Sequence, residues 1–305
     1  MIPHLGKQAV DQNVLLLGVD GGGTRCRARL SAVSGKILSE AEAGPANLRL
    51  GLGQSFSAVV EAAEQCLHRA FMSRQHLARI VACLALAGAS EPGHLAAAER
   101  ERHPFRKAVI TTDAHAACIG AHCGNDGGVI VAGTGAVGWA IVQGQPRRFG
   151  GWGLPISDEG GGAWLGAEAV RRVLWANDGR ISWTPLLRDL FADFRNDPHA
   201  IVTWTATASP RDFGSLAPRV VAHTGNGDVA AVELMSLAAT HLDILGARLV
   251  AAGAPRLALV GGFAPFVRPW LDEATSSHLV EPADDALTGA LRLARSAAEP
   301  LLQVA

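Results

Sequence analysis

VLLLGVDGGGTR, residues Val14 to Arg25, joins a continuous apolar run to an aspartate, three glycines and a threonine. A run this uniformly apolar favours a central strand that is covered on both faces of a sheet. The glycines Gly21, Gly22 and Gly23 allow backbone conformations closed to other residues, and they let main-chain N–H groups approach an anion. The stretch therefore predicts a strand that delivers a phosphate-binding turn. An ordinary hairpin turn is the alternative, because Asp-Gly and Gly-Gly are also common hairpin signals.

Two side chains of this stretch add to the phosphate chemistry. Asp20 stands at the end of the strand, where a carboxylate could hold a hydrated Mg²⁺ beside the phosphates. Thr24 supplies a hydroxyl donor next to the glycines.

The composition favours a protein that acts on small molecules. The chain has 305 residues, 49% hydrophobic and 18% charged, which is ample for two medium α/β domains. Its formal net charge of -1 and its pI near 6.8 provide no field that would attract nucleic acid or an anionic membrane. We therefore expect neither a nucleic-acid nor a membrane partner.

The cysteines and the N-terminus predict a cytoplasmic location. The five cysteines are an odd number without a CxxC pair, so a disulfide framework is not expected. The first dozen residues lack the apolar core of a signal peptide, and no apolar run approaches the roughly 18 residues of a membrane span.

The apolar pattern downstream indicates a doubly wound α/β fold. A hairpin is expected around residues 34–35, an amphipathic helix over 55–71, a buried strand over 80–86 and a further strand over 108–112. Strand, helix, strand, helix, strand is the order typical of such folds.

Two polar residues of this first half could serve either structure or chemistry. Asp113 follows a strand and precedes a helix, so it is either an N-cap or an active-site carboxylate at the carboxyl edge of a parallel sheet. Asn47 lies in a Gly/Pro loop, where turn chemistry competes with hydrogen bonding to a sugar.

The second half of the chain repeats the pattern of an apolar run followed by a glycine and threonine turn. Residues 128–132 form an apolar run that ends in Gly133-Thr134-Gly135, and a second strand is expected over 136–142. A β-hairpin explains this motif by itself. Two strand-to-Gly/Thr turns in one chain, however, suggest two halves built alike that could grip a polyphosphate.

The remaining segments offer one loop and one glycine pair. The glycine-rich loop 149–162 carries Trp152, Asp158 and Glu159, whose carboxylates could bond sugar hydroxyls or cap the helix that follows. A buried strand over 257–260 precedes Gly261 and Gly262, which could lie flat against an adenine or simply form a turn. We assign no chemistry to residues 176–227, and we expect long helices over 228–252 and 286–297.

Taken together, these motifs resemble the N-acetylglucosamine kinases of the BadF/BadG/BcrA/BcrD group of actin-like, ribonuclease H-fold ATPases. The resemblance spans about residues 14–297 and is carried by Asp-Gly-Gly-Gly-Thr at 20–24, Thr-Asp-Ala at 112–114, Ala-Gly-Thr-Gly at 132–135, Gly-Gly-Trp-Gly at 150–153, Asp-Glu-Gly at 158–160 and Val-Gly-Gly at 260–262.

The resemblance implies an α/β fold of two actin-like (ribonuclease H-like) domains, each with a mixed five-stranded sheet flanked by helices, and a central ATP/sugar cleft. Residues 1–112, joined by a closing helix over 286–305, would form the N-terminal domain, and residues 113–285 the C-terminal domain. ATP and Mg²⁺ would be the cofactors and an amino sugar the substrate, and a homodimer is expected.

The same resemblance implies roles for individual residues. Asp113 would be the general base that accepts the proton of the sugar 6-hydroxyl. Nucleotide binding would fall to Asp20, Gly21, Gly22, Gly23, Thr24, Gly133, Thr134, Gly135, Gly261 and Gly262, and sugar binding to Asn47, Gly151, Trp152 and Asp158. Asp20 would hold Mg²⁺ through water.

Two departures from the family pattern concern the sugar site. Ser157 replaces the usual glycine before Asp-Glu-Gly, and Ala89-Ser90 replaces a serine- or glycine-rich loop. Two other functions stay open: a glucosamine kinase of the same family, and an ATPase activator of a radical dehydratase, which would require cysteine thiolates for an iron–sulfur cluster.

Overall fold

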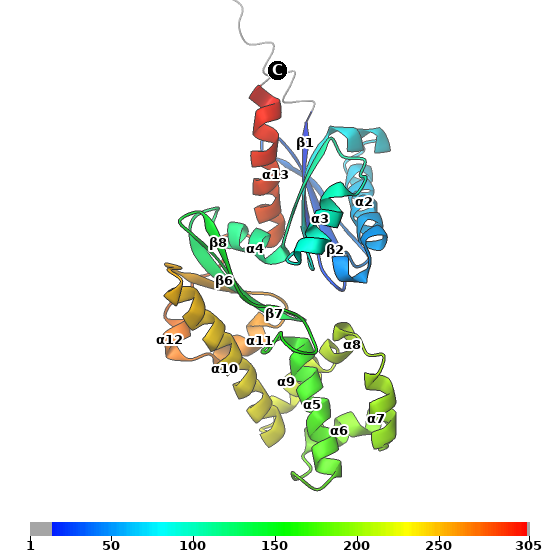
Figure 1. Ribbon diagram of the computed structural model, residues 1–305, viewed down its shortest axis with the longest axis vertical. Helices are drawn as coiled ribbons and strands as arrows, with labels where there is room; N and C mark the ends of the chain where they lie inside the picture. The colour runs from blue at the N-terminus through cyan, green and yellow to red at the C-terminus, as the bar shows by residue number, and fades with distance from the viewer. Residues whose placement is uncertain (1–13, 304–305) are drawn as a thin grey trace, which may run out of the picture. The chain divides into compact units, whose positions relative to one another are not determined.

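The computed structural model describes residues 14–303, which form two compact α/β units (Figure 1). The first unit contains residues 14–125 and 282–303, and the second is the continuous segment 126–281. Residues 1–13, where no signal peptide was expected, lie outside the described part of the chain.

The first unit is built on a five-stranded mixed sheet with the order β3-β2-β1-β4-β5. Its strands are β1 (Leu15–Gly21), β2 (Cys26–Ala32), β3 (Ile37–Ala43), β4 (Ile80–Leu86) and β5 (Lys107–Thr111). β1, β2 and β3 form an antiparallel meander, whereas β4 and β5 run parallel to β1. The predicted hairpin, the buried strand β4 and the further strand β5 are confirmed, and β5 at the sheet edge is half-buried.

Helices cover both faces of this sheet, which explains why β1 is apolar from Leu15 to Val19 and becomes polar only at Asp20, near its end. α13 (Ala286–Gln303) packs on one face, where a Cβ on Gly18 would lie 2.5 Å from Leu287 O. α2 (Leu52–Arg69) packs on the other face (Figure 1). The unit is completed by α3 (Pro92–Arg100), α4 (Asp113–Ala121) and the 3₁₀ helices η1 (Leu48–Leu50) and η2 (Arg74–Arg79).

The second unit repeats the strand order of the first in a four-stranded sheet, β8-β7-β6-β9. Its strands are β6 (Gly127–Ala132), β7 (Ala136–Val142), β8 (Gln145–Gly150) and β9 (Leu257–Val260). The prediction of five strands here is wrong: beside β9, a single parallel bridge between Leu257 and Leu279 stands where β5 extends the first sheet. The inference of two halves built alike is confirmed by the shared order.

Most helices of the second unit are inserted between β8 and β9. They are α5 (Gly162–Asn177), α6 (Pro185–Asp193), α7 (Pro198–Thr205), α8 (Pro210–Gly214), α9 (Ala217–Thr224) and α10 (Val229–Ala251). After β9 come α11 (Ala264–Val267), η3 (Arg268–Trp270) and α12 (Glu273–Ser276). Prolines begin several of these helices, because proline lacks an N–H that the first helical turn does not need.

α10 is the one helix among residues 14–303 that is long and apolar enough to span a membrane by length and composition. Glu233, Asp243 and Arg248 interrupt its apolar residues, so this helix does not contradict the expectation that no continuous apolar run reaches that length. The buried side of α10, including Leu234, Met235 and Leu242, packs into the core of the second unit, as in the core helix of a globular domain.

The division between the units lies after α4, whereas the sequence suggested a boundary before it. α4 belongs to the first unit because it packs closely on α13: a Cβ on Gly289 would lie 1.9 Å from Ala116 O. The predicted cleft between the two domains stays a prediction.

Candidate functional site

The first glycine turn links β1 to β2 at the carboxyl end of β1. Gly22 N donates to Arg25 O at 2.9 Å and closes the turn. None of Gly21, Gly22 and Gly23 has a left-handed φ, so the prediction that the turn needs glycine for its backbone conformation is wrong. At Gly21 the reason is space, since a Cβ would lie 2.6 Å from Leu86 Cδ2. Gly23 and Thr24 are exposed.

Asp20 is paired across the meander with an arginine. Arg27 is its direct partner on β2, and Arg27 Nη2 lies 2.6 Å from Asp20 Oδ2. No group of three or more His, Cys, Asp or Glu side chains within residues 14–303 could hold a metal ion. One carboxylate still fits Mg²⁺, because this ion commonly binds through one or two carboxylates, water and substrate phosphates.

Asn47 lies between the loops that follow β1 and β4. Its Oδ1 accepts from Arg49 N at 3.0 Å and so caps η1, which is the turn chemistry expected as one alternative. The same residue is close to the first glycine turn, since a Cβ on Gly23 would lie 3.7 Å from its Nδ2. A Cβ on Gly88, in the other loop, would lie 3.0 Å from its Oδ1.

Asp113 is the first residue of α4, directly after β5. The N-cap is Thr112, whose hydroxyl accepts from His115 N, so of the two alternatives for Asp113 the N-cap is wrong. Asp113 Oδ1 accepts from Ala114 N at 2.9 Å. Burial lowers the pKa of the neighbouring His115, whose Nδ1 lies 3.1 Å from Thr111 Oγ1.

The first unit therefore gathers its predicted residues at one edge. β1, β4 and β5 are parallel, so their carboxyl ends share an edge of the sheet, the usual place for ligands in open α/β sheets. Asp20 and the glycine turn lie at the end of β1. Asn47 pairs with Ala87 just after β4, and Asp113 lies just after β5.

The second glycine turn is tied to the start of α5. Gly133 N donates to Gly135 O at 2.9 Å within the turn. Gly162 N and Ala163 N, at the first turn of α5, donate to Gly133 O at 2.8 Å and to Thr134 O at 2.9 Å. These bonds fix the turn against the helix.

Asp158 packs directly on this turn. It has a left-handed φ of 69°, and its Oδ1 accepts from Gly153 N at 2.9 Å. A Cβ on Gly135 would lie 2.3 Å from Asp158 Oδ2, and a Cβ on Gly161 would lie 2.6 Å from Gly135 C. Only glycine permits contacts this close.

Ser157, the departure from the family pattern, is a structural link within the loop. Its side chain is buried, accepts from Trp152 N at 3.3 Å and donates to Glu159 Oε2 at 3.3 Å. The ring of Trp152 is 63% exposed. Beside it, Gly151 has a φ of 70°, and a Cβ there would lie 2.6 Å from Val137 Cβ.

The last glycine pair follows β9 and lies against the end of β6. Gly261 has a φ of 108°, and a Cβ there would lie 2.4 Å from Ala132 O, directly before the second glycine turn. Nothing lies within 4 Å of a Cβ placed on Gly262. The predicted nucleotide residues of the second unit are therefore neighbours.

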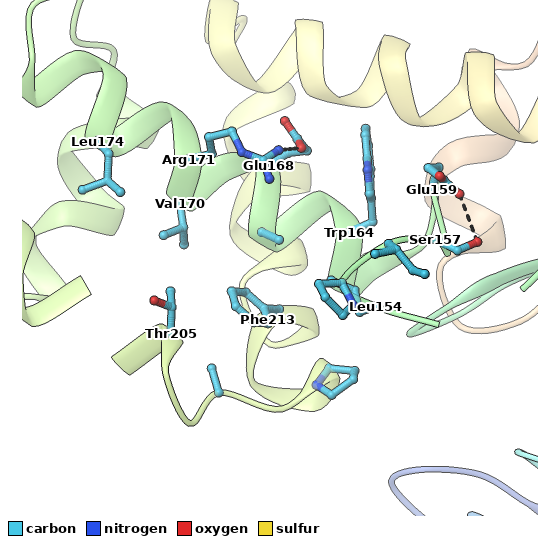
Figure 2. A pocket seen from close by; sticks show the side chains of 15 residues that line it. Leu154, Ser157, Glu159, Trp164, Glu168, Val170, Arg171, Leu174, Thr205 and Phe213 are labelled. Atoms are coloured by element: carbon cyan, nitrogen blue, oxygen red, sulfur yellow. Dashed lines mark hydrogen bonds and ion pairs between the residues drawn. The ribbon is translucent and has the colours of Figure 1, made fainter. Parts of the chain in front are cut away.

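A cavity of about 610 Å³ adjoins the Asp158 loop in the second unit (Figure 2). Figure 2 shows Val170 and Leu174 of α5 on one side, Thr205 and Phe213 opposite, and Glu159 beyond Trp164. Its lining includes Ser157 and Glu159 of the loop but none of the residues assigned above to nucleotide or sugar binding, and it does not include the second glycine turn.

The sequence analysis missed two arginines that contact predicted site residues. Arg27 could have been found from the register of the predicted meander, which places it opposite Asp20. Arg148, which contacts Trp152, gave no signal, because its contacts depend on how the chain turns after β8.

Comparison with known proteins agrees with the fold and motifs. The model of the BadF/BadG/BcrA/BcrD ATPase family matches residues 17–290. A glucosamine kinase of Vibrio cholerae is 37% identical over 278 residues, which cover 91% of this chain and 95% of that protein. An N-acetylmuramic acid/N-acetylglucosamine kinase of Clostridium acetobutylicum is 26% identical over 235 residues, 74% of this chain and 76% of that protein.

Solved structures show the same architecture. The structure of a putative N-acetylglucosamine kinase from Chromobacterium violaceum superposes with a TM-score of 0.87 and 33% identity, covering 92% of this chain and 99% of that one. A glucokinase of the ROK family from Streptomyces griseus, at 18% identity and a TM-score of 0.54 over 92% and 99% of the two chains, shares the fold alone. The predicted actin-like α/β fold is confirmed.

Proposed function

This chain belongs to the BadF/BadG/BcrA/BcrD ATPase family and is a sugar kinase, and we propose that it transfers the γ-phosphoryl group of ATP to the 6-hydroxyl of an amino sugar. The observation that carries the proposal is the contact between Asp158 and Gly135. This contact joins a residue proposed to bind sugar hydroxyls directly to the turn proposed to hold phosphate, both within the second unit.

The first unit would supply the base and the metal ligand. Asp113, which follows the carboxyl end of β5, would accept the proton of the attacking hydroxyl, an effect worth about 10²–10⁴-fold in rate. Asp20 would hold Mg²⁺ through water, and the ion would neutralise charge on the transferring phosphate. Phosphoryl transfer needs mainly such positioning and charge stabilisation, which glycine turns and two carboxylates can provide.

Nucleotide and sugar would be held by the loops described above within each unit. The N–H groups of Gly21–Thr24 and Gly133–Gly135 would contact the phosphates, and the Gly261–Gly262 turn would contact the adenosine. Asn47, Gly151, Trp152 and Asp158 would contact the sugar.

We assign free glucosamine as the preferred substrate and N-acetylglucosamine as the second candidate. The relative named a glucosamine kinase is 37% identical and covers 91% of the chain, whereas the relative named for the acetylated sugars is 26% identical. This order reverses the sequence prediction. The second candidate is supported by the 33% identical structure of a putative N-acetylglucosamine kinase.

A sugar panel with coupled ADP detection tests the proposal. Glucosamine, N-acetylglucosamine and glucose would be compared with ATP and Mg²⁺, and ³¹P NMR of the product would locate the phosphate. A higher kcat/KM for glucosamine supports the assignment, a higher value for the acetylated sugar selects the second candidate, and no turnover of either amino sugar refutes the proposed function.

The residues do not favour the dehydratase-activator alternative. Four of the five cysteines are buried, and burial raises the pKa of Cys26 and Cys83 to about 12. Cluster ligands must be thiolates, and Cys123 is the one exposed thiol among residues 14–303. The homodimer and the cytoplasmic location stay predictions; light scattering tests the former.

A further inference from the structure

Arg148, on β8, contacts three consecutive residues of the proposed sugar-binding loop. Its Nε donates to Gly150 O at 3.0 Å, and its Nη2 donates to Gly151 O. Its guanidinium carbon lies 4.1 Å from the ring centroid of Trp152. One half-buried side chain thus holds two carbonyls and one aromatic ring.

We propose that Arg148 is a positioning residue for the sugar, an inference that rests on the proposed function of this loop. It would act by fixing the carbonyl directions of Gly150 and Gly151 and the plane of the Trp152 indole. It need not touch the sugar itself.

The contacts of Arg148 with Gly150, Gly151 and Trp152 are here called the clamp. The backbone of this segment explains why the clamp is needed. Gly150 and Gly151 have φ values of 65° and 70°, and two successive glycines lose much conformational freedom when they are ordered. Trp152 is 63% exposed, so packing alone does little to fix its ring. With the guanidinium over one face, the orientation of the indole is set before a ligand arrives.

Arginine suits this task and lysine does not. A guanidinium is a planar fork that can donate to two carbonyls while stacking on an aromatic face. An ammonium has no plane to stack, and it cannot hold the two carbonyls and the ring in the same geometry. Arg148→Lys therefore separates the fork geometry from the positive charge.

The neighbouring Arg147 provides a matched control. It is exposed and occupies the adjacent position of the same strand, so its side chain points to the opposite side of the sheet. Arg147→Met removes the same charge from the same strand without removing the clamp.

Steady-state kinetics with the amino sugar and ATP varied separately would test the proposal. Arg148→Met and Arg148→Lys should each raise the sugar KM about tenfold, since one charge-assisted hydrogen bond is worth roughly that factor. The ATP KM should change less than about twofold, because Gly151 and Trp152, which Arg148 holds, are proposed to bind the sugar and not the nucleotide. Sugar dissociation constants from isothermal titration should rise with KM, and Arg147→Met should match the wild type.

Three results would overturn the proposal. The first is a wild-type sugar KM in Arg148→Lys, which would leave no role for the fork. The second is a parallel rise of the sugar and ATP KM values together with a lowered Tm, which indicates a general structural role. The third is a wild type that neither binds nor phosphorylates an amino sugar, which refutes the proposed function itself; the first two leave that function intact.

Discussion

Replacing Gly135 with alanine tests whether the second glycine turn packs against Asp158 of the following loop. The added Cβ would lie 2.3 Å from Asp158 Oδ2 and 3.0 Å from its Cγ, too close for either atom to stay. The carboxylate would have to rotate and lose its hydrogen bond from Gly153 N. Gly133 is the matched control, because a Cβ there has its nearest neighbour at 4.0 Å.

The expected cost follows from that one hydrogen bond. A hydrogen bond to a charged group contributes about 1.5–3 kcal/mol. Asp158 is only partly buried, so the displaced carboxylate regains part of this from water. We expect Gly135→Ala to lower the free energy of unfolding by about 1–2 kcal/mol and the Tm by about 3–6 °C. Gly133→Ala should leave the Tm unchanged or raise it slightly, because its φ is not left-handed.

A double-mutant cycle shows whether Asp158 is the cause. In an Asp158→Ala background the atoms at 2.3 and 3.0 Å are gone, and the nearest remaining atom of that side chain is Cβ at 3.7 Å. The cost of Gly135→Ala should then vanish, giving a coupling of about 1–2 kcal/mol in urea unfolding of the four proteins. An equal cost of Gly135→Ala in both backgrounds would refute the reasoning.

Three further predictions concern the first unit. Asp113→Asn should lower kcat by about 10²–10⁴-fold. Calorimetry should find the sugar affinity retained, because the amide oxygen of asparagine can accept from Ala114 N as the carboxylate oxygen does. An unchanged kcat excludes the base role. Burial raises the pKa of Asp285, but hydrogen bonds from Arg29 outweigh it and hold that pKa below its ordinary value of 3.8. This stabilisation is complete above pH 3.8 and is lost as pH falls through the lower folded pKa. Arg29→Met should therefore reduce the fall of the Tm between neutral and acid pH. Parallel curves of Tm against pH for the wild type and the variant would contradict this. A thiol reagent at about pH 8 should label Cys123 alone, since burial raises the pKa of thiols such as Cys26 to about 12; mass spectrometry showing a second labelled cysteine in the folded protein would count against it.

The local pattern of the chain predicted much of the fold. β1 and β6 were recognisable because an apolar run followed by glycines has few structural solutions, and the repeated motif indicated the repeated meander. The five-strand prediction failed in the second unit because Leu279, where a fifth strand would pair, keeps only one bridge to Leu257. A single bridge leaves no trace in the periodicity of a sequence.

Contacts between distant segments were beyond the sequence. Thr112 and Asp113 are both suitable N-caps by residue type, and only the backbone decides that Thr112 takes the position. The close approach of Asp158 to Gly135 likewise depends on how a long loop folds back on a turn. The sequence identified these residues and could not show which of them touch.

The placement of α13 has a consequence for how the chain folds during synthesis. α13 covers the face of the first sheet that carries Leu16, Val81 and Cys83, yet all of residues 126–281 are synthesised between that sheet and its covering helix. At 5–20 residues per second, that segment takes on the order of 10–30 s to emerge from the ribosome. The second unit, which is continuous, can complete its core while the earlier one still waits with an apolar face open to chaperones. The part of the protein that begins first is then the last to finish.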